Sequence, residues 1–283
     1  MHSYDAANLG HELYNSGNNS ADALGSYVKY SVPTVVNGKV YAGTQNALAG
    51  FGLAQAVTPG GLAITNAANY GSSVAPGSIV SLFAPIGVTA ATANSTPLPW
   101  NLATVSVRVN GMLAPIFYAG PNQINAQIPF ETPVGQNTFV VSIAGRDWTS
   151  GTINVGATAP GLFTVAPGQA AVTNQDGSVN GANQPARVGT VITAYLTGQG
   201  AVQPAVATGT SAPLSPLSRP TASVTATVAG QPATVLFAGL TPTTTGIFQV
   251  NLAVPQVAAG QQSIVINVGG VDSNPSSIYV SAQ

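Results

Sequence analysis

The sequence predicts an all-β protein made of two β-sandwiches in tandem, preceded by a shorter N-terminal segment of strands. Three observations support this fold class: apolar and polar residues alternate, whole blocks of sequence recur, and turn-forming residues interrupt the chain every few positions. The 283 residues include 32 glycines and 21 prolines, and helical periodicity is nearly absent. The expected divisions are 1–58 for the N-terminal segment, 59–165 for the first sandwich and 166–283 for the second.

An internal repeat defines the two sandwiches. Three blocks recur in the same order and almost without gaps. They pair Val105–Gly120 (VSVRVNGMLAPIFYAG) with Val224–Gly239 (VTATVAGQPATVLFAG), Val134–Gly145 with Ala259–Gly270, and Pro76–Ala84 with Val188–Leu196. A duplicated unit of about 100 residues has the size of an immunoglobulin-like sandwich. We therefore expect two such domains, with the boundary between them in 157–168.

Within each block the apolar residues recur with a period of two. Val105, Val107 and Val109 alternate with Ser106 and Arg108, as expected for antiparallel strands that place one face on a core. Asn110-Gly111 then supplies a two-residue hairpin turn, in which both positions need positive φ. In the N-terminal segment, Asn37-Gly38 predicts a similar hairpin.

Charge is scarce along the whole chain. Only 5% of the residues are charged and the formal net charge is −1, whereas about 25% is usual in soluble proteins. Nucleic acid is excluded as a partner because no basic face can neutralise phosphates, and insertion into a membrane is not expected because no apolar run of about 18 residues exists. Weak self-repulsion favours association with further copies.

Three stretches of the two sandwiches resemble a known family. They are YAGPNQINAQIPF (Tyr118–Phe130), NQDGSVNGANQPARVGTVITAYLTGQG (Asn174–Gly200) and VLFAGLTPTTTGIFQVNLAVP (Val235–Pro255). They resemble the Solibacter-type C-terminal domain, an uncharacterised module at the ends of secreted acidobacterial proteins, over roughly 59–283. The resemblance implies an extracellular or cell-surface setting and a role as an appendage, but no activity, cofactor or catalytic residue.

The N-terminal segment resembles a different family. SYDAANLGHELYNS (Ser3–Ser16) and VPTVVNGKVYAGTQNALAGFG (Val32–Gly52) are similar to the last blade of quinoprotein-like β-propellers. The other blades are absent from this sequence, and quinone-cofactor chemistry needs a complete ring around a central site. The resemblance therefore implies a strand or hairpin segment left over from a propeller blade, without dehydrogenase activity.

Such a hairpin is expected to bury its apolar side chains against another sheet. An isolated two-stranded hairpin does not offset the entropy lost on ordering its backbone. The partner is either an edge of the first sandwich of the same chain or a sheet of a neighbouring subunit, as in strand complementation. The side chains expected at this contact are Tyr27, Val28, Tyr30, Val32, Val35, Val40 and Tyr41.

Few groups in the sequence suit catalysis or metal binding. Both histidines, His2 and His11, lie in the N-terminal segment, far along the chain from any sandwich serine that a catalytic triad would need. Glu131 and Asp147 each follow a strand end, and they are read as solvated turn residues rather than as a glycosidase pair. We therefore expect no enzyme, no cofactor and no catalytic residue.

Two further features allow a binding role. The stretch Asn174–Gly181 partly imitates a calcium loop, but Val172 and Asn183 stand where ligands are required, so the expectation is an Asp-Gly turn and no metal site. Trp100 and Trp148 could stack on a sugar ring, or they could anchor the core or edge of the sandwich.

Together these features predict a non-enzymatic extracellular structural protein, a subunit of a filament or surface layer joined through its N-terminal β segment. Its main partner is then a second copy of the chain, in an oligomer or polymer. Two alternatives remain: a cell-surface adhesion or carbohydrate-binding module that binds extracellular polysaccharide, and a passive spacer of a larger secreted propeller protein. Because no signal peptide opens the sequence, a secreted protein would here be a mature chain or a fragment.

Overall fold

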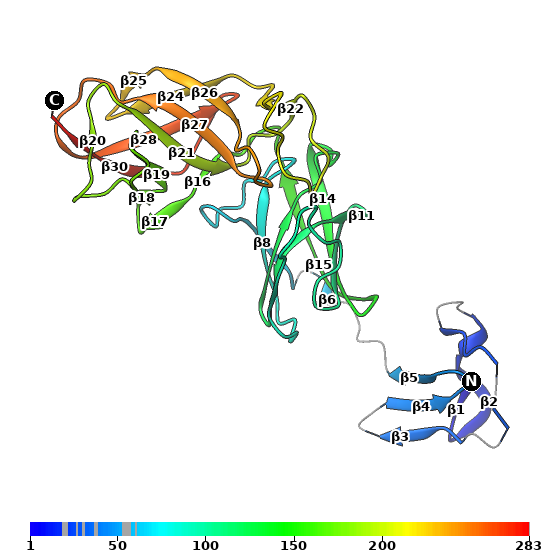
Figure 1. Cartoon of the computed structure of the whole chain (residues 1–283). Coiled ribbons are helices and arrows are strands. Elements are labelled where there is room, and N and C mark those ends of the chain that lie inside the picture. Colours follow the sequence, from blue (N-terminus) through cyan, green and yellow to red (C-terminus); the bar gives the residue numbers. More distant parts are fainter. Residues whose placement is uncertain are drawn as a thin grey trace. The chain divides into compact units, whose positions relative to one another are not determined.

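The computed structural model describes residues 1–18, 22–26, 28–29, 32–36, 39–52, 58–59 and 61–282 (Figure 1). The chain divides into two compact units, Met1–Ala56 and Val57–Gln283. In the described residues the protein is all-β, with a short three-residue 3₁₀ turn, η1 (Ser16–Asn18). No helix in the described ranges has the length and apolar character needed to cross a bilayer.

The N-terminal unit, Met1–Ala56, contains two small antiparallel sheets. One is a ribbon of β1 (His2–Asp5) and β2 (Asn8–Asn15), and the other is a three-stranded sheet of β3 (Thr34–Val36), β4 (Lys39–Gly43) and β5 (Leu48–Gly52). The expected hairpin is present, since Val36 pairs with Lys39, although the turn residues Asn37 and Gly38 lie outside the described residues. The glycine-rich β5 was not expected as a strand.

Two five-stranded sheets form the first sandwich. One has the order β7-β8-β13-β12-β9 and the other the order β11-β10-β14-β15-β6. The bounds of the first sheet are Ala63–Asn66, Ile79–Phe83, Gln123–Gln127, Ile116–Ala119 and Ala91–Thr92. Those of the second are Met112–Ala114, Val105–Val109, Gly135–Ile143, Arg146–Val155 and Thr58–Pro59.

The second sandwich repeats this plan (green to red in Figure 1). One sheet has the order β16-β21-β27-β26, with β19 also on β21; the other has the order β17-β18-β30-β28-β24-β25, with β20 on β30 and β29 on β28. The bounds of the first sheet are Gly161–Leu162, Val191–Thr197, Phe248–Ala253 and Val235–Leu240, with β19 at Val172–Thr173.

The other sheet of this sandwich contains eight strands. They are, in the same order, Thr164–Ala166, Gln169–Ala170, Ser276–Ser281, Gly260–Val268, Val224–Val228 and Gln231–Ala233, with β20 at Ala186–Arg187 and β29 at Val271–Asp272. A short pair, β22 (Val202–Gln203) and β23 (Arg219–Pro220), lies in the long connection that precedes β24.

The strand order is that of an immunoglobulin-like fold in both sandwiches. In the first sandwich, β7-β8-β13-β12 form one sheet and β10-β14-β15 form the other. In the numbering of the seven strands of an immunoglobulin-like domain, the first sheet contains strands one, two, five and four, and the second contains strands three, six and seven. In the second, β16-β21-β27-β26 and β24-β28-β30 have the same arrangement. The tandem immunoglobulin-like prediction is therefore confirmed.

The predicted alternation places the apolar side chains between the two sheets. Val105, Val107 and Val109 are fully buried together with Phe139 and Val141 of β14, and they belong to one cluster with residues of the opposite sheet. The second sandwich has an equivalent cluster. The expected turn is also present, because Asn110 and Gly111 have φ values of 48° and 85°, which a type I′ hairpin requires.

Backbone groups of the two sandwiches meet through a polar junction. The Ile79 N–H donates to Thr197 Oγ1 at 2.9 Å, and this buried hydroxyl donates to the Gly246 carbonyl at 3.1 Å. Nearby, the Gly209 N–H donates to Gln127 Oε1 at 2.8 Å. Polar groups buried in this way stabilise a contact only in one geometry, so the junction holds the two sandwiches in a defined arrangement.

Gly198 is the position at which this junction tolerates least change. Its φ is +92°, and a Cβ at this position would lie 1.9 Å from the Ala159 carbonyl oxygen. Gly168 also has a positive φ, +74°, but a Cβ there would meet no atom within 4 Å. Both positions carry the left-handed strain of an L-residue, about 1–2 kcal/mol, and only Gly198 adds a clash between backbone and side chain.

Gly198→Ala should therefore lower the free energy of unfolding by about 3 kcal/mol or more, while Gly168→Ala should cost only the shared backbone strain. Urea unfolding of both variants, followed by fluorescence and circular dichroism, measures the difference. Equal losses in the two variants would contradict the junction described here.

Candidate functional site

The residues expected to form an assembly contact lie in the N-terminal unit, and several of them are exposed there. Val32 and Val35 are 79% and 72% exposed, Val28 is also exposed, and Val40 and Tyr41 are half-buried. Tyr27 and Tyr30 lie outside the described residues. The expected burial of Val28, Val32 and Val35 is thus not provided by the sheet that contains or flanks them, because β3 pairs only with β4 in the described part of the chain.

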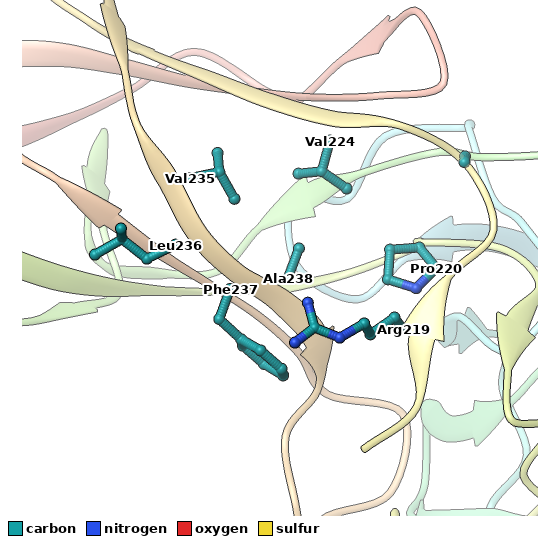
Figure 2. A pocket seen from close by; sticks show the side chains of 8 residues that line it. Arg219, Pro220, Val224, Val235, Leu236, Phe237 and Ala238 are labelled. Carbon is teal, nitrogen blue, oxygen red and sulfur yellow. The ribbon is translucent and has the colours of Figure 1, made fainter. Parts of the chain in front are cut away.

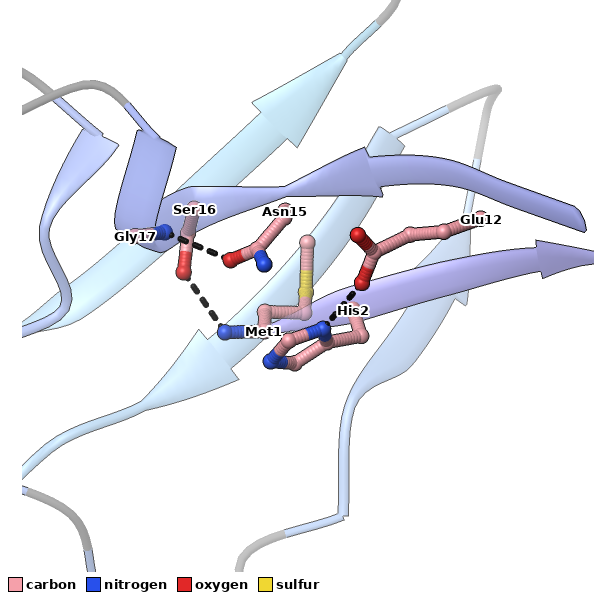
Figure 3. Close-up of polar contacts among 6 residues, drawn as sticks. All are labelled: Met1, His2, Glu12, Asn15, Ser16 and Gly17. Atoms are coloured by element: carbon pink, nitrogen blue, oxygen red, sulfur yellow. Dashed lines mark hydrogen bonds and ion pairs between the residues drawn. The ribbon is translucent and has the colours of Figure 1, made fainter.

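The ribbon β1-β2 is held by polar contacts (Figure 3). The N-terminal ammonium donates to Ser16 Oγ at 2.6 Å, and the His2 ring contacts the Glu12 carboxylate. This hydrogen bond lowers the pKa of the Glu12 carboxyl. His11 lies 3.7 Å from Asp5 Oδ2, so each histidine is engaged with a carboxylate of the same ribbon.

Glu131 and Asp147 are not brought together. Thr208 Oγ1 donates to Glu131 Oε2 at 2.8 Å, whereas Asp147 Oδ1 accepts from Arg108 and Ser142. The nine residues of β14 separate them, which at about 3.3 Å per residue places the two carboxylates roughly 20 Å or more apart. A glycosidase pair needs about 5 to 9.5 Å, so these two carboxylates do not form one; Glu131 lies in a turn, as expected, whereas Asp147 lies on strand β15.

The stretch that imitates a calcium loop uses its polar groups on itself. Asn174 Nδ2 donates to the Gln184 carbonyl, and Asn180 Nδ2 donates to Asn174 Oδ1. Asp176 Oδ1 accepts from the side chain and the backbone of Ser178, and the side-chain hydrogen bond lowers the pKa of this carboxyl first of all. Among the described residues, no cluster of three or more acidic, histidine or cysteine side chains could hold a metal ion.

The two tryptophans belong to different parts of the first sandwich. Trp148 lies on β15 and its indole N–H donates to the Pro85 carbonyl at 3.0 Å, so its polar edge is occupied. Trp100 is exposed in the loop before β10, next to the Pro99 carbonyl that accepts from Ile116 of β12 in the opposite sheet. The structure therefore does not combine the two indoles into one stacking surface.

The sequence did not indicate a hollow beside β26, the last strand of its sheet. Its volume is about 250 Å³, and its wall is formed by Arg219, Pro220, Ala222, Val224, Val235, Leu236, Phe237 and Ala238. Figure 2 shows the Arg219 guanidinium beside the Phe237 ring, 4.8 Å from its centre, a distance typical of a cation–π contact. Arg219 is the one charged side chain among the residues that form its wall.

A testable consequence concerns the Asp176 turn. Ser178→Ala removes the hydroxyl that lowers the pKa of Asp176, so this pKa should rise towards its ordinary value, while Ser178→Thr should keep it low. Because the folded-state pKa is lowered, the turn is stabilised at neutral pH and loses this stabilisation as the pH falls through that pKa. Side-chain carboxyl titration by NMR measures both variants, and equal pKa values would rule out the hydroxyl as the cause.

Comparisons with known proteins add only distant likenesses. No family model matches the sequence, and no curated protein matches it. Among solved structures, a surface glycan-binding protein of Bacteroides ovatus from a mixed-linkage glucan utilization locus, in complex with a heptasaccharide, is similar at 12% identity and a TM-score of 0.35. The match covers 86% of this chain and 52% of that one, so this chain spans about half of that protein's length.

Two further solved structures are similar at the same low level. Domains 5–6 of the S-layer protein SbsC have 12% identity and a TM-score of 0.26, with 78% of this chain and 97% of that chain covered. A tandem of titin domains has 12% identity and a TM-score of 0.22, with 87% and 74% covered.

Proposed function

We propose that this protein is a non-enzymatic extracellular structural subunit that associates with further copies of itself through its N-terminal unit, in a filament or surface layer. The observation that carries the proposal is the apolar surface of that unit. Its exposed large apolar side chains are Tyr4, Leu9, Leu13, Val28, Val32, Val35, Val36 and Leu48. These eight side chains are gathered within the described residues of one small unit, and exposed apolar surface that exceeds scattered single residues marks an interaction site.

The scarcity of charge supports self-association. With 6 basic and 7 acidic side chains in 283 residues, two copies that meet lose little hydration of ionic groups and repel each other weakly. The extracellular setting rests on the resemblance of 59–283 to modules of secreted proteins. A role without catalysis accords with the contacts of these groups: Glu12, Asp5 and Asp147 are engaged within their own ribbon or hairpin, and Glu131 accepts from Thr208.

The whole N-terminal unit is the first target for a test. The full chain should form concentration-dependent assemblies in sedimentation velocity, whereas a chain of residues 57–283 should stay monomeric because the exposed apolar surface has been removed. Negative-stain microscopy of the full chain shows whether the assemblies are fibres or sheets.

Two controls accompany the deletion. Unfolding of the sandwiches should be unchanged in the shortened chain, since its cores are complete without the N-terminal unit. The full chain with Val134→Asp and Val165→Asp, two exposed valines of the sandwiches, should assemble like the wild type. A full chain that stays monomeric at high concentration contradicts the proposal.

The alternative, a carbohydrate-binding or adhesion module, is favoured by one observation, the exposed indole of Trp100. An exposed indole can stack on the apolar face of a sugar. If the alternative is correct, Trp100→Ala should abolish the retardation of the protein in native gels that contain an extracellular polysaccharide, while Trp148→Phe should leave it unchanged. No retardation of the wild type would remove this alternative.

A further inference from the structure

The two sandwiches differ at one edge of the otherwise equivalent sheets. In the first, β12 is covered by β9, with Tyr118 paired to Thr92 and Ala119 to Ala91, and the Ala93 N–H donates to the Phe117 carbonyl at 2.8 Å. In the second, the equivalent strand β26 pairs in the described residues only with β27. The Ser218 carbonyl accepts from the Leu240 N–H and β23 lies next to β26, so the chain flanks the C-terminal part of this edge, whereas Leu236 and Phe237 have no ladder partner on this side in the described residues.

The hollow beside β26 coincides with the place of the missing strand. The repeat relates position 105 to 224, so Phe117, Tyr118 and Ala119 correspond to Leu236, Phe237 and Ala238. These last three residues line the hollow. The first sandwich thus shows what fits this edge: an extended, uncharged segment that pairs antiparallel with the strand.

The residues of β26 carry little of the protection that usually prevents pairing between chains, although a register irregularity lies at Leu236 and β23, with Arg219 and Pro220, lies beside the strand. Natural edge strands are protected by charged residues, proline or bulges. The stretch Val235–Leu240 contains no charge and no proline, and its register irregularity is confined to the step from Val235 to Phe237. Leu236 is 56% exposed. An extended segment from elsewhere can therefore hydrogen-bond along this edge and cover Leu236.

We propose that the open edge of β26 accepts strand β2 of a second copy of this chain, antiparallel, with Glu12 opposite Phe237 and Leu13 opposite Leu236. This inference rests on the proposed self-association and names its acceptor and its donor. The choice of β2 as the donor strand rests on charge complementarity. The hollow contains one cation, Arg219, for which no described carboxylate lies within ion-pair distance, and this guanidinium lies over Phe237.

Strand β2 provides the complementary group. It pairs only with β1 in the described residues, Leu13 is 59% exposed, and Glu12 is ionised at neutral pH because the hydrogen bond with His2 lowers its pKa (Figure 3). The strand β3 of the N-terminal unit is less suitable, because its residues Thr34–Val36 include no acidic side chain that could pair with Arg219.

A charge exchange tests the pairing. Arg219→Glu and Glu12→Arg each place like charges in contact, so each variant alone should need about a tenfold or higher concentration for half-assembly than the wild type. An equimolar mixture of the two should assemble as the wild type does, because both contacts between unlike copies are then complementary. Sedimentation velocity measures assembly, and circular dichroism verifies that each variant is folded.

The outcomes separate this inference from the proposed function. If the wild type assembles and both single variants assemble equally well, the β2–β26 contact is wrong and self-association stands. If the mixture fails to recover, the contact is likewise wrong. If the wild type does not assemble at all, the proposed function fails and this inference fails with it.

Disulfide trapping tests the register independently, because the chain has no cysteine. The double variant Leu13→Cys with Leu236→Cys should form a ladder of covalent oligomers on mild oxidation. The matched control, Leu13→Cys with Leu113→Cys, uses an exposed leucine on β11 of the first sandwich and should stay largely uncrosslinked. Equal ladders in both, or a ladder in neither, would overturn the proposed register.

Discussion

Backbone hydrogen bonding at the edges of the sheets is the constraint on which the organisation of this protein depends. Each strand at the end of a sheet leaves a row of N–H and C=O groups unpaired, and these groups must find water, another segment or another chain. The first sandwich uses its own chain, through β9 on β12 and β6 on β15. The second covers β30 with β18 and β20, but in the described residues it leaves Leu236 and Phe237 of β26 without a ladder partner on the edge side.

The low charge increases the consequence of an open edge. A surface rich in Lys and Glu would keep two neutral strands of different molecules apart, and this chain has few such residues. One of its ion pairs, Arg108 with Asp147, lies between β10 and β15 of the same sheet. Thr, Ser, Asn and Gln instead satisfy buried backbone groups at the junction of the sandwiches. The same composition thus permits a polar interior contact and weakly repelling surfaces.

The regular part of the fold could be predicted from the sequence, and the contacts between distant segments could not. Alternation at Val105, Val107 and Val109 and the Asn110-Gly111 turn are local signals, and they predict strands and a hairpin directly. The approach of Gly198 to Ala159, or of Ile79 to Thr197, depends on how two sandwiches meet, and no local pattern encodes it. The hollow at β26 could not be predicted from the sequence repeat, because the repeat indicates only the features that the two sandwiches share. The hollow lies where the second sandwich lacks a strand paired as β9 is in the first.

Duplication within one chain provides a comparison in which each sandwich serves as the reference for the other. Asp147 and Asp272 occupy equivalent positions after a hairpin; the first accepts from Ser142 and Arg108, and the second accepts from Asn267 while Thr227 replaces the arginine. The hairpin anchor is thus retained in both copies while the charge pair is not. The edge strand differs between the two sandwiches in the same way, because β12 pairs with β9 whereas β26 has no equivalent pairing. The effect is larger here, since backbone groups are left unpaired. Because donor and acceptor would be different strands, their contact is heterologous, and a heterologous contact that does not close into a ring continues as a fibre.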